Sequence, residues 1–292
     1  MFSEKLISQQ TWYEWWNPVY FLVVLLFAYL YKRFVIGSDH EEAVSKKQMN
    51  YFYISLILFY IMNGSPFNVM ADQYLFSAHV LGLSILLFVI PPFFILSLPM
   101  TRIRQYFWNH QKKELMNFLL HPWFTGITFN VALTLYLTPR VFNVIHESPF
   151  FSFLYQLLLF AAALFVWWTI IVQVPGLKNL SEFGRICYIF LLSLLLMPIG
   201  IYLLIGENLS YQMSEIASFG LLPAFTGRYD HQLAGGILKT IQLLSYGIAM
   251  FIIMRNWARR EEAEEGKVPD ENIRLVQGVV IHLKENNHVK RP

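Results

Sequence analysis

Long apolar stretches, separated by short polar ones, run along most of the chain. A helix needs about 20 apolar residues to cross a hydrocarbon core about 30 Å thick. The alternating pattern of a membrane β-barrel is absent, and helices satisfy their backbone groups internally in lipid. Seven stretches have this length, at residues 17–36, 51–69, 74–99, 123–142, 150–174, 186–206 and 233–254. The pattern predicts an all-α, polytopic membrane protein with seven transmembrane helices.

The composition agrees with a chain embedded in the lipid bilayer. Of the 292 residues, 56% are hydrophobic, 17% are aromatic and only 14% are charged, whereas soluble domains are about 25% charged. This composition excludes a soluble enzyme. The single Cys187 excludes an intrachain disulfide framework, and the net charge of +3 gives no reason to expect a nucleic-acid partner.

The basic residues are distributed unevenly between the two sides of the predicted bundle. One set of alternate loops, together with the start of the tail, carries most of the basic residues, and the loops on the other side of the membrane carry only Lys5, Arg140 and Arg228. The basic residues of the first set are Lys32, Arg33, Lys46, Lys47, Arg102, Arg104, Lys112, Lys113, Lys178, Arg185, Arg255, Arg259 and Arg260. Because basic loops stay in the cytoplasm, we expect the N-terminus outside and the C-terminus inside.

The chain ends differ from the predicted spans. Residues 1–16 lack the basic region of a cleavable signal peptide, and their three tryptophans are typical of an interfacial aromatic belt. We therefore assign residues 1–260 to the seven-helix domain. Residues 261–292 are polar and charged, and we expect a flexible cytoplasmic tail. No internal repeat of fixed period is visible, which disfavours an inverted-repeat transporter.

Three histidines fall on or near the outer face in this topology: His79, His146 and His231. Neutral imidazole is the commonest metal-ligating side chain. Asp72 and Asp230 could orient the ring nitrogens. Thioether ligands favour Cu(I), and three methionines lie at the same outer level: Met62, Met70 and Met213. The alternative is structural, since an interfacial histidine is often only hydrogen-bonded and methionine is common apolar filler.

The seventh span carries a second unusual feature. Lys239 lies well inside the hydrocarbon, where a charged group requires a partner or a water-lined cavity. Gly235 and Gly236 would let a helix or a ligand approach closely. At 100° per residue, one direction of this helix is shared by His231, Gly235, Leu238 and Gln242. In the structural alternative, Lys239 snorkels or pairs with a carboxylate such as Asp230.

Proline interrupts two of the predicted spans. Pro91-Pro92 lies in the third span and Met197-Pro198 in the sixth. Proline removes a backbone donor and clashes with the preceding turn, so we expect both helices to bend at these positions.

Sequence signatures of catalysis are absent. The chain has no Walker loop, dinucleotide glycine fingerprint, helical zinc-protease motif or local nucleophile signature. We therefore do not expect an enzyme.

Several short motifs, in order along the chain, resemble the CtaG family of cytochrome c oxidase assembly factors. The run from Tyr74 to His79, then Ile90-Pro91-Pro92 and Leu98-Pro99, is similar to the third-span signature of that family. The positions of Lys239 and Gln242 are similar to Bacillus-type members, and the resemblance covers about residues 15–260. Further matching motifs are His121-Pro122, Trp167-Trp168 and the run from Asp230 to Gly236.

The resemblance implies a bacterial plasma-membrane protein that helps to build a haem–copper oxidase. Copper is the implied cargo, destined for the copper B centre of subunit I, and subunit I and other copper-delivery proteins are the implied partners. By position, the residues that match the family are His79, Asp230, Gln232 and Gly235. Two positions depart from the pattern: Leu83 stands where many members have a second histidine, and His231 stands where glutamine is usual.

The leading hypothesis is an assembly factor that holds Cu(I) transiently near the outer membrane boundary. His79 would be the chief ligand, with His231 or His146 and a methionine such as Met70 completing a low-coordinate site. Asp72, Asp230, Gln232, Lys239 and Gln242 would supply supporting polar contacts. Two alternatives remain open: a haem- or quinone-binding membrane redox protein, and an assembly scaffold that never touches metal.

Overall fold

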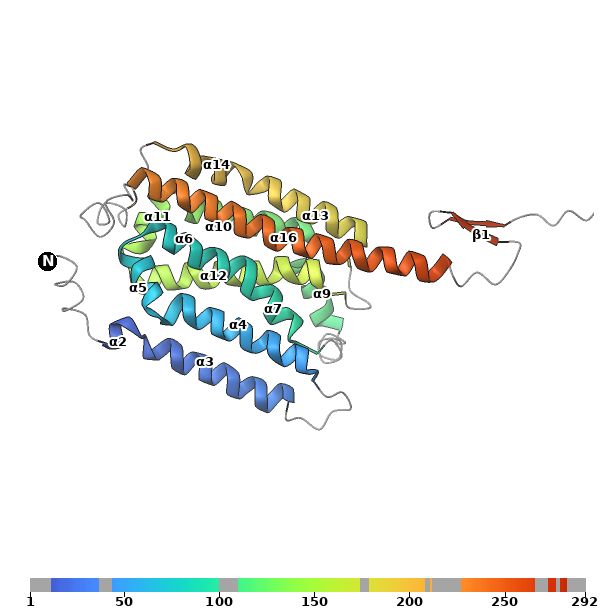
Figure 1. Cartoon of the computed structure of the whole chain (residues 1–292), viewed down its shortest axis with the longest axis horizontal. Helices are drawn as coiled ribbons and strands as arrows, with labels where there is room; N and C mark the ends of the chain where they lie inside the picture. Colours follow the sequence, from blue (N-terminus) through green and yellow to red (C-terminus); the bar gives the residue numbers. More distant parts are fainter. Residues whose placement is uncertain are drawn as a thin grey trace, which may run out of the picture. The chain divides into compact units, whose positions relative to one another are not determined.

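Figure 1 shows the computed structural model of the chain, which describes residues 12–36, 44–99, 110–173, 179–207, 211, 227–265, 273–276 and 279–282. The chain divides into two compact units, Met1–Tyr246 and Gly247–Pro292. Helices account for every described element of the first unit, as the apolar pattern predicts.

The helical elements follow one another along the chain with short breaks. The first half contains α2 (Trp12–Trp15), α3 (Pro18–Tyr31), the π-helical η1 (Lys32–Ile36), α4 (Lys46–Gly64), α5 (Pro66–Gln73), α6 (Phe76–Ser84), the π-helical η2 (Ile85–Val89) and α7 (Ile90–Leu96). The second half contains α9 (His110–Leu119), α10 (Pro122–Tyr136), α11 (Pro139–His146), α12 (Pro149–Ile171), α13 (Glu182–Leu195), α14 (Met197–Ile205) and α16 (Gly227–Glu265).

Five helical stretches of the described residues are long and apolar enough to cross a membrane, so the chain is a multi-pass membrane protein. These stretches are Pro18–Ile36, Phe76–Leu96, Pro149–Ile171, Glu182–Ile205 and Gly227–Ala263. Together, α4 and α5 make a sixth candidate that bends by 50° between its halves. The predicted fourth span, 123–142, is divided: α10 has 15 residues, and a new helix begins at Pro139. Seven spans and their orientation therefore remain predictions.

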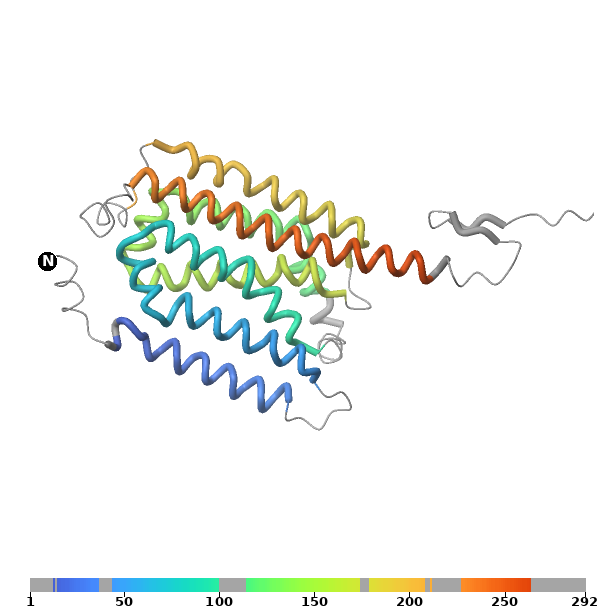
Figure 2. Tube along the Cα trace, viewed as in Figure 1, coloured from blue at the N-terminus to red at the C-terminus, as the bar shows by residue number. Residues whose placement is uncertain are grey.

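The bundle is built from neighbouring helices that Figure 2 traces through the first unit. Along one side α3 lies beside α4, α4 beside α7, and α7 beside α12. The helices α10 and α13 also contact α12. Only 6% of the α3 span is buried, so its apolar side chains face outward, as expected for contact with lipid.

The third span shows how the double proline is accommodated. It is interrupted by η2 immediately before Pro91-Pro92, and the Ile90 N–H bonds to the carbonyl of Ile85, five residues back. The Leu87 carbonyl would accept from residue 91 or 92, and neither proline has an N–H. The buried Trp167 indole of α12 donates to this carbonyl at 3.0 Å. The chain is also interrupted before Pro198, where α13 ends and α14 begins.

The second unit contains the end of α16 and a hairpin of two strands. β1 (Ile273–Val276) pairs antiparallel with β2 (Val279–His282), with Ile273 opposite His282. The charge-rich composition of residues 261–292 did not predict either the helical continuation to Glu265 or these strands.

Candidate metal site around His79

The start of α6 is held by a side chain from a distant helix. Leu75 precedes α6 without any side-chain cap, so the first N–H groups of the helix need other acceptors. Asp230 of α16, fully buried, accepts from the Phe76 N–H at 2.8 Å and from the Ser77 N–H at 3.0 Å. Charge-assisted bonds of this kind at a helix N-terminus are strong. Asp230 therefore fixes the position of the turn that carries His79.

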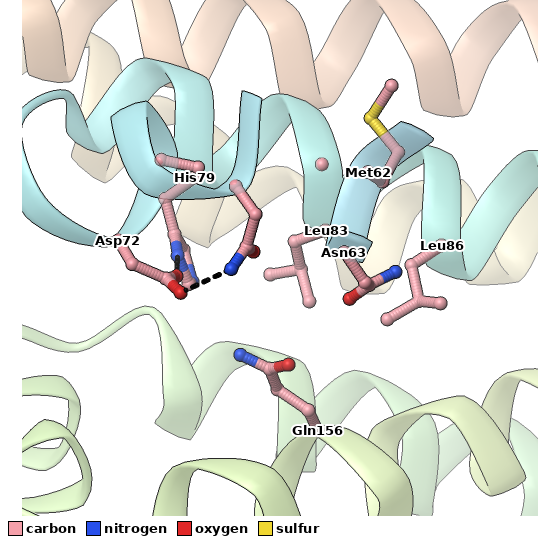
Figure 3. Close-up of a pocket in the computed structure, with 10 residues that line it drawn as sticks. Met62, Asn63, Asp72, His79, Leu83, Leu86 and Gln156 are labelled. Atoms are coloured by element: carbon pink, nitrogen blue, oxygen red, sulfur yellow. Dashed lines mark hydrogen bonds and ion pairs between the residues drawn. The ribbon is translucent and has the colours of Figure 1, made fainter. Parts of the chain in front are cut away.

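His79 is buried, with 5% of its surface exposed, and both of its ring nitrogens face polar groups. Nε2 lies 2.8 Å from the Tyr136 hydroxyl, and Nδ1 lies 3.6 Å from Oδ1 of Asp72. Asp72 is itself held by Asn68, whose side-chain amide donates to Oδ2 at 2.9 Å. Figure 3 shows Asp72 directly beside the His79 ring.

His146, at the end of α11, presents a ring nitrogen without a hydrogen-bond partner. Its Nδ1–H donates to the Phe142 carbonyl at 2.8 Å, so Nε2 carries the free lone pair. This Nε2 is buried and accepts no hydrogen bond. Burial, and then the nearby His79, lower the pKa of His146 to about 4. The imidazole is therefore neutral at pH 7, which is the form that binds metals.

The two rings meet at this place. The His79 and His146 centroids are 5.2 Å apart, with the rings at 76° to each other. Phe142 stacks on His146 at 3.9 Å and meets His79 edge-on at 5.3 Å. These contacts place the imidazoles of α6 and α11 in one buried aromatic cluster.

The third predicted ligand, His231, lies elsewhere in the cluster. Its buried ring packs against Phe76 at 5.5 Å and Tyr211 at 4.9 Å. Within the described part of the chain, no three His, Cys, Asp or Glu side chains are grouped as a metal site. The structure thus brings together two of the three predicted histidines.

A small pocket opens beside His79. It has a volume of about 20 Å³, roughly the space that one ordered water occupies. Its lining includes Met62, Asn63, Asp72, His79, Leu83 and Gln156 (Figure 3). The pocket can therefore take one small occupant next to the His79 ring.

The predicted methionines differ in their placement. Met62 lines the pocket, whereas Met70 is 43% exposed. Met213 lies outside the described residues. Met62 is thus the predicted methionine that lines the pocket beside His79.

The polar residues of α16 form separate contacts. Lys239 donates to the side-chain oxygen of Gln242 at 2.8 Å, not to Asp230, whose oxygens accept from α6. Gln242 is fully buried, and its Nε2 has no hydrogen-bond partner. Gln232 is partly buried. In this group, Asp230 is bonded to α6, the element that carries His79.

Sequence reasoning missed two residues of the site, Tyr136 and Gln156. Tyr136 is fully buried, and its hydroxyl bonds to His79 and also accepts from the Gln156 amide at 3.4 Å. Tyr136 is one of 16 tyrosines. In the sequence, Tyr136 could have been distinguished from the other tyrosines only by its predicted depth in the membrane, near the outer end of the fourth predicted span.

The donors present suit some metals better than others. Structural zinc sites use four protein ligands, and the described residues supply no such group. Two imidazoles with a thioether nearby suit a soft ion of low coordination number, such as Cu(I). The unpaired, buried Nε2 of His146 is the specific observation that a ligand would explain.

A comparison with models of protein families gives a match over most of the chain. The family model for the cytochrome c oxidase caa3 assembly factor (Caa3_CtaG) matches residues 27–260, which include α6, α11 and most of α16. No curated protein and no solved structure shows a significant match. The match covers most of the chain, and the motifs around His79 and Asp230 lie within it. The chain therefore belongs to the Caa3_CtaG family of cytochrome c oxidase assembly factors.

Proposed function

We propose that this protein holds Cu(I) as cargo between His79 and His146 and supplies it to the copper B centre of subunit I during oxidase assembly. The observation that carries the proposal is the buried, unpaired Nε2 of His146, whose ring lies beside the His79 ring with centroids 5.2 Å apart. An unpaired buried acceptor is costly, and a bound metal would satisfy it.

The geometry favours an exchangeable ion over a permanently bound one. Two imidazoles leave the coordination shell of the metal incomplete, which allows a third ligand from a partner to enter. Met62 lines the adjoining pocket and is a candidate for transient contact. Leu83, one turn after His79, is apolar and lines the same pocket. His146 thus offers from α11 the second imidazole that many family members carry on the third span.

The pocket volume favours the copper proposal over the haem or quinone alternative. Cofactor sites for molecules of drug size enclose roughly 300–1,000 Å³, whereas this pocket measures about 20 Å³. This pocket beside His79 offers room for an ion and not for a macrocycle. We propose that the protein is not an enzyme and that its partners are subunit I and other copper-delivery proteins.

The proposal includes the topology of the protein in a bacterial plasma membrane. We infer seven spans, with α10 as the short fourth span, an outer N-terminus and a cytoplasmic C-terminus. The bias of basic residues supports this orientation. It would place the His79–His146 pair at the outer end of the bundle, where copper arrives from outside the cell.

Anaerobic titration of the purified full-length protein with Cu(I) tests the proposal. We expect one ion per chain, and we expect His79→Ala and His146→Ala each to weaken binding at least 10-fold, because each removes one of two ligands. His231→Gln is the matched control: it introduces the residue usual at this position and should leave binding unchanged. Equal binding by all four proteins would contradict the assigned pair. No binding by the wild type would contradict the copper role.

A further inference from the structure

The hydroxyl of Tyr136 lies at hydrogen-bond distance from Nε2 of His79. Resting on the copper role proposed above, we infer that Tyr136 sets the Cu(I) affinity of the protein by competing with the ion for Nε2 of His79. The 2.8 Å separation of these two atoms is the basis of the inference.

The neighbouring contacts favour Tyr136 as the donor to Nε2 of His79. The Gln156 amide donates to the Tyr136 oxygen at 3.4 Å, and a phenol carries a single proton. That proton is then free to point at Nε2 of His79. We assign the ring proton of His79 to Nδ1, the nitrogen that lies 3.6 Å from the Asp72 carboxylate. With this assignment, Tyr136 accepts from Gln156 and donates to Nε2 of His79, while Nδ1 lies near the Asp72 carboxylate.

The two histidines consequently differ in their readiness for a metal. The lone pair on Nε2 of His146 accepts no hydrogen bond, whereas that on Nε2 of His79 is engaged by Tyr136. An ion bound to both nitrogens must displace the tyrosine proton. Each binding event thus costs one hydrogen bond, and each release restores it, which lowers affinity and favours transfer.

The tyrosine ring is held in place for this role. It is fully buried, stacks on Tyr155 at 5.3 Å, and meets Phe142 at 5.6 Å. It also lies nearly parallel to the His79 ring, at 25°. With the ring fixed by its neighbours, the hydroxyl remains within reach of His79.

The Tyr136→Phe variant tests the inference in the full-length protein. We expect its affinity for Cu(I), measured anaerobically against a coloured Cu(I) chelator, to rise about 2- to 10-fold, the range that one net hydrogen bond represents. Transfer of the bound ion to excess chelator should slow by a similar factor. A variant that merely damaged the fold would show the opposite sign, with weaker binding.

Tyr155→Phe provides the matched control. It removes a hydroxyl from the ring stacked on Tyr136, but this hydroxyl donates to the Ala132 carbonyl and not to His79. Its affinity should equal that of the wild type. Unchanged or weaker binding by Tyr136→Phe, with wild-type binding that depends on His79 and His146, would overturn the role of Tyr136 alone. Absence of Cu(I) binding by the wild type would overturn the copper proposal and this inference together.

Discussion

At the scale of single residues, the site depends on a carboxylate that does not touch it. Asp230 holds the first turn of α6 through two backbone N–H groups, and His79 lies at the end of that turn, three residues after Phe76. The sequence indicated that Asp230 was important through its place in a family motif. Its role as the cap of another helix depends on tertiary packing across 154 residues, which no local pattern reveals.

Removal of this carboxylate is predicted to destabilise the protein. In Asp230→Ala, two buried N–H groups lose their acceptor, at a cost of about 1–3 kcal/mol each. We expect a large drop in the thermal unfolding temperature of the detergent-solubilised protein, together with weaker Cu(I) binding as His79 shifts. Glu207→Gln is the control, because the Glu207 carboxylate is exposed and pairs with Arg228 away from the site. Equal unfolding temperatures for the wild type and Asp230→Ala would contradict the capping role.

His146 gives the protein a pH-dependent stability. Its pKa is about 4 in the folded protein, because burial disfavours the charged ring, and about 6.5 in an unfolded chain. Between these values the unfolded state binds more protons. Folding stability is therefore lost as the pH falls from 6.5 towards 4, by at most about 1.4 kcal/mol per pH unit.

Thermal unfolding of the wild type and of His146→Gln across this pH range isolates the effect of the one group. The glutamine variant should show a shallower decline towards acidic pH, because it has no proton to take up. Parallel pH curves for the two proteins would show that His146 is not held neutral by burial.

At the scale of elements, two adjacent glycines of α16 face different surroundings. A Cβ on Gly235 would lie 2.9 Å from the Leu203 Cβ and 3.1 Å from the Leu204 backbone nitrogen, whereas a Cβ on Gly236 would meet nothing within 4 Å. Gly235 therefore allows α14 and α16 to pack closely. The predicted small-residue contact on this helix is thus assigned to Gly235 alone.

The two glycines provide a matched pair of substitutions. Gly235→Ala should destabilise the protein by about 1–3 kcal/mol, because α14 must move to make room. Gly236→Ala should be neutral or stabilising by up to about 1 kcal/mol, through higher helix propensity. Thermal unfolding of both variants measures the contrast, and equal effects would show that α14 and α16 do not meet at Gly235.

The double proline gives a second prediction at this scale. Trp167→Phe leaves the Leu87 carbonyl without the indole donor, and the prolines that follow supply no N–H. We expect a loss of about 1–3 kcal/mol in stability. Trp123→Phe, on an exposed side chain, is the control. A similarly small effect of both substitutions would show that the Leu87 carbonyl does not depend on Trp167.

The apolar pattern located the helices better than their ends. The predicted span 123–142 runs through Pro139, yet this proline begins α11 after Thr138. The restriction that proline places on the preceding residue was visible in the sequence. The approach of His79 to His146 was not visible in the sequence, because it depends on how α6 and α11 pack. The pairing of Lys239 with Gln242 was not visible either, because it depends on the side-chain rotamers.

At the scale of the whole molecule, the uneven distribution of basic residues predicts the topology. Cys187 is the only cysteine, so Cys187→Ser gives a cysteine-free background for labelling. We expect a cysteine introduced near residue 147 to react with a membrane-impermeant maleimide in intact cells, and one near residue 263 to react only after lysis. The reverse pattern would contradict the orientation and would put the His79–His146 pair on the cytoplasmic side.

The copper content of the oxidase assembled in cells tests the central claim most directly. The oxidase would be purified from cells whose only assembly factor is the wild type, His146→Ala or His231→Gln, with the amount of membrane-inserted factor matched. We predict that His146→Ala yields oxidase with normal haem but less copper and lower activity, and that His231→Gln yields normal enzyme. Full copper content and activity with His146→Ala would contradict the account.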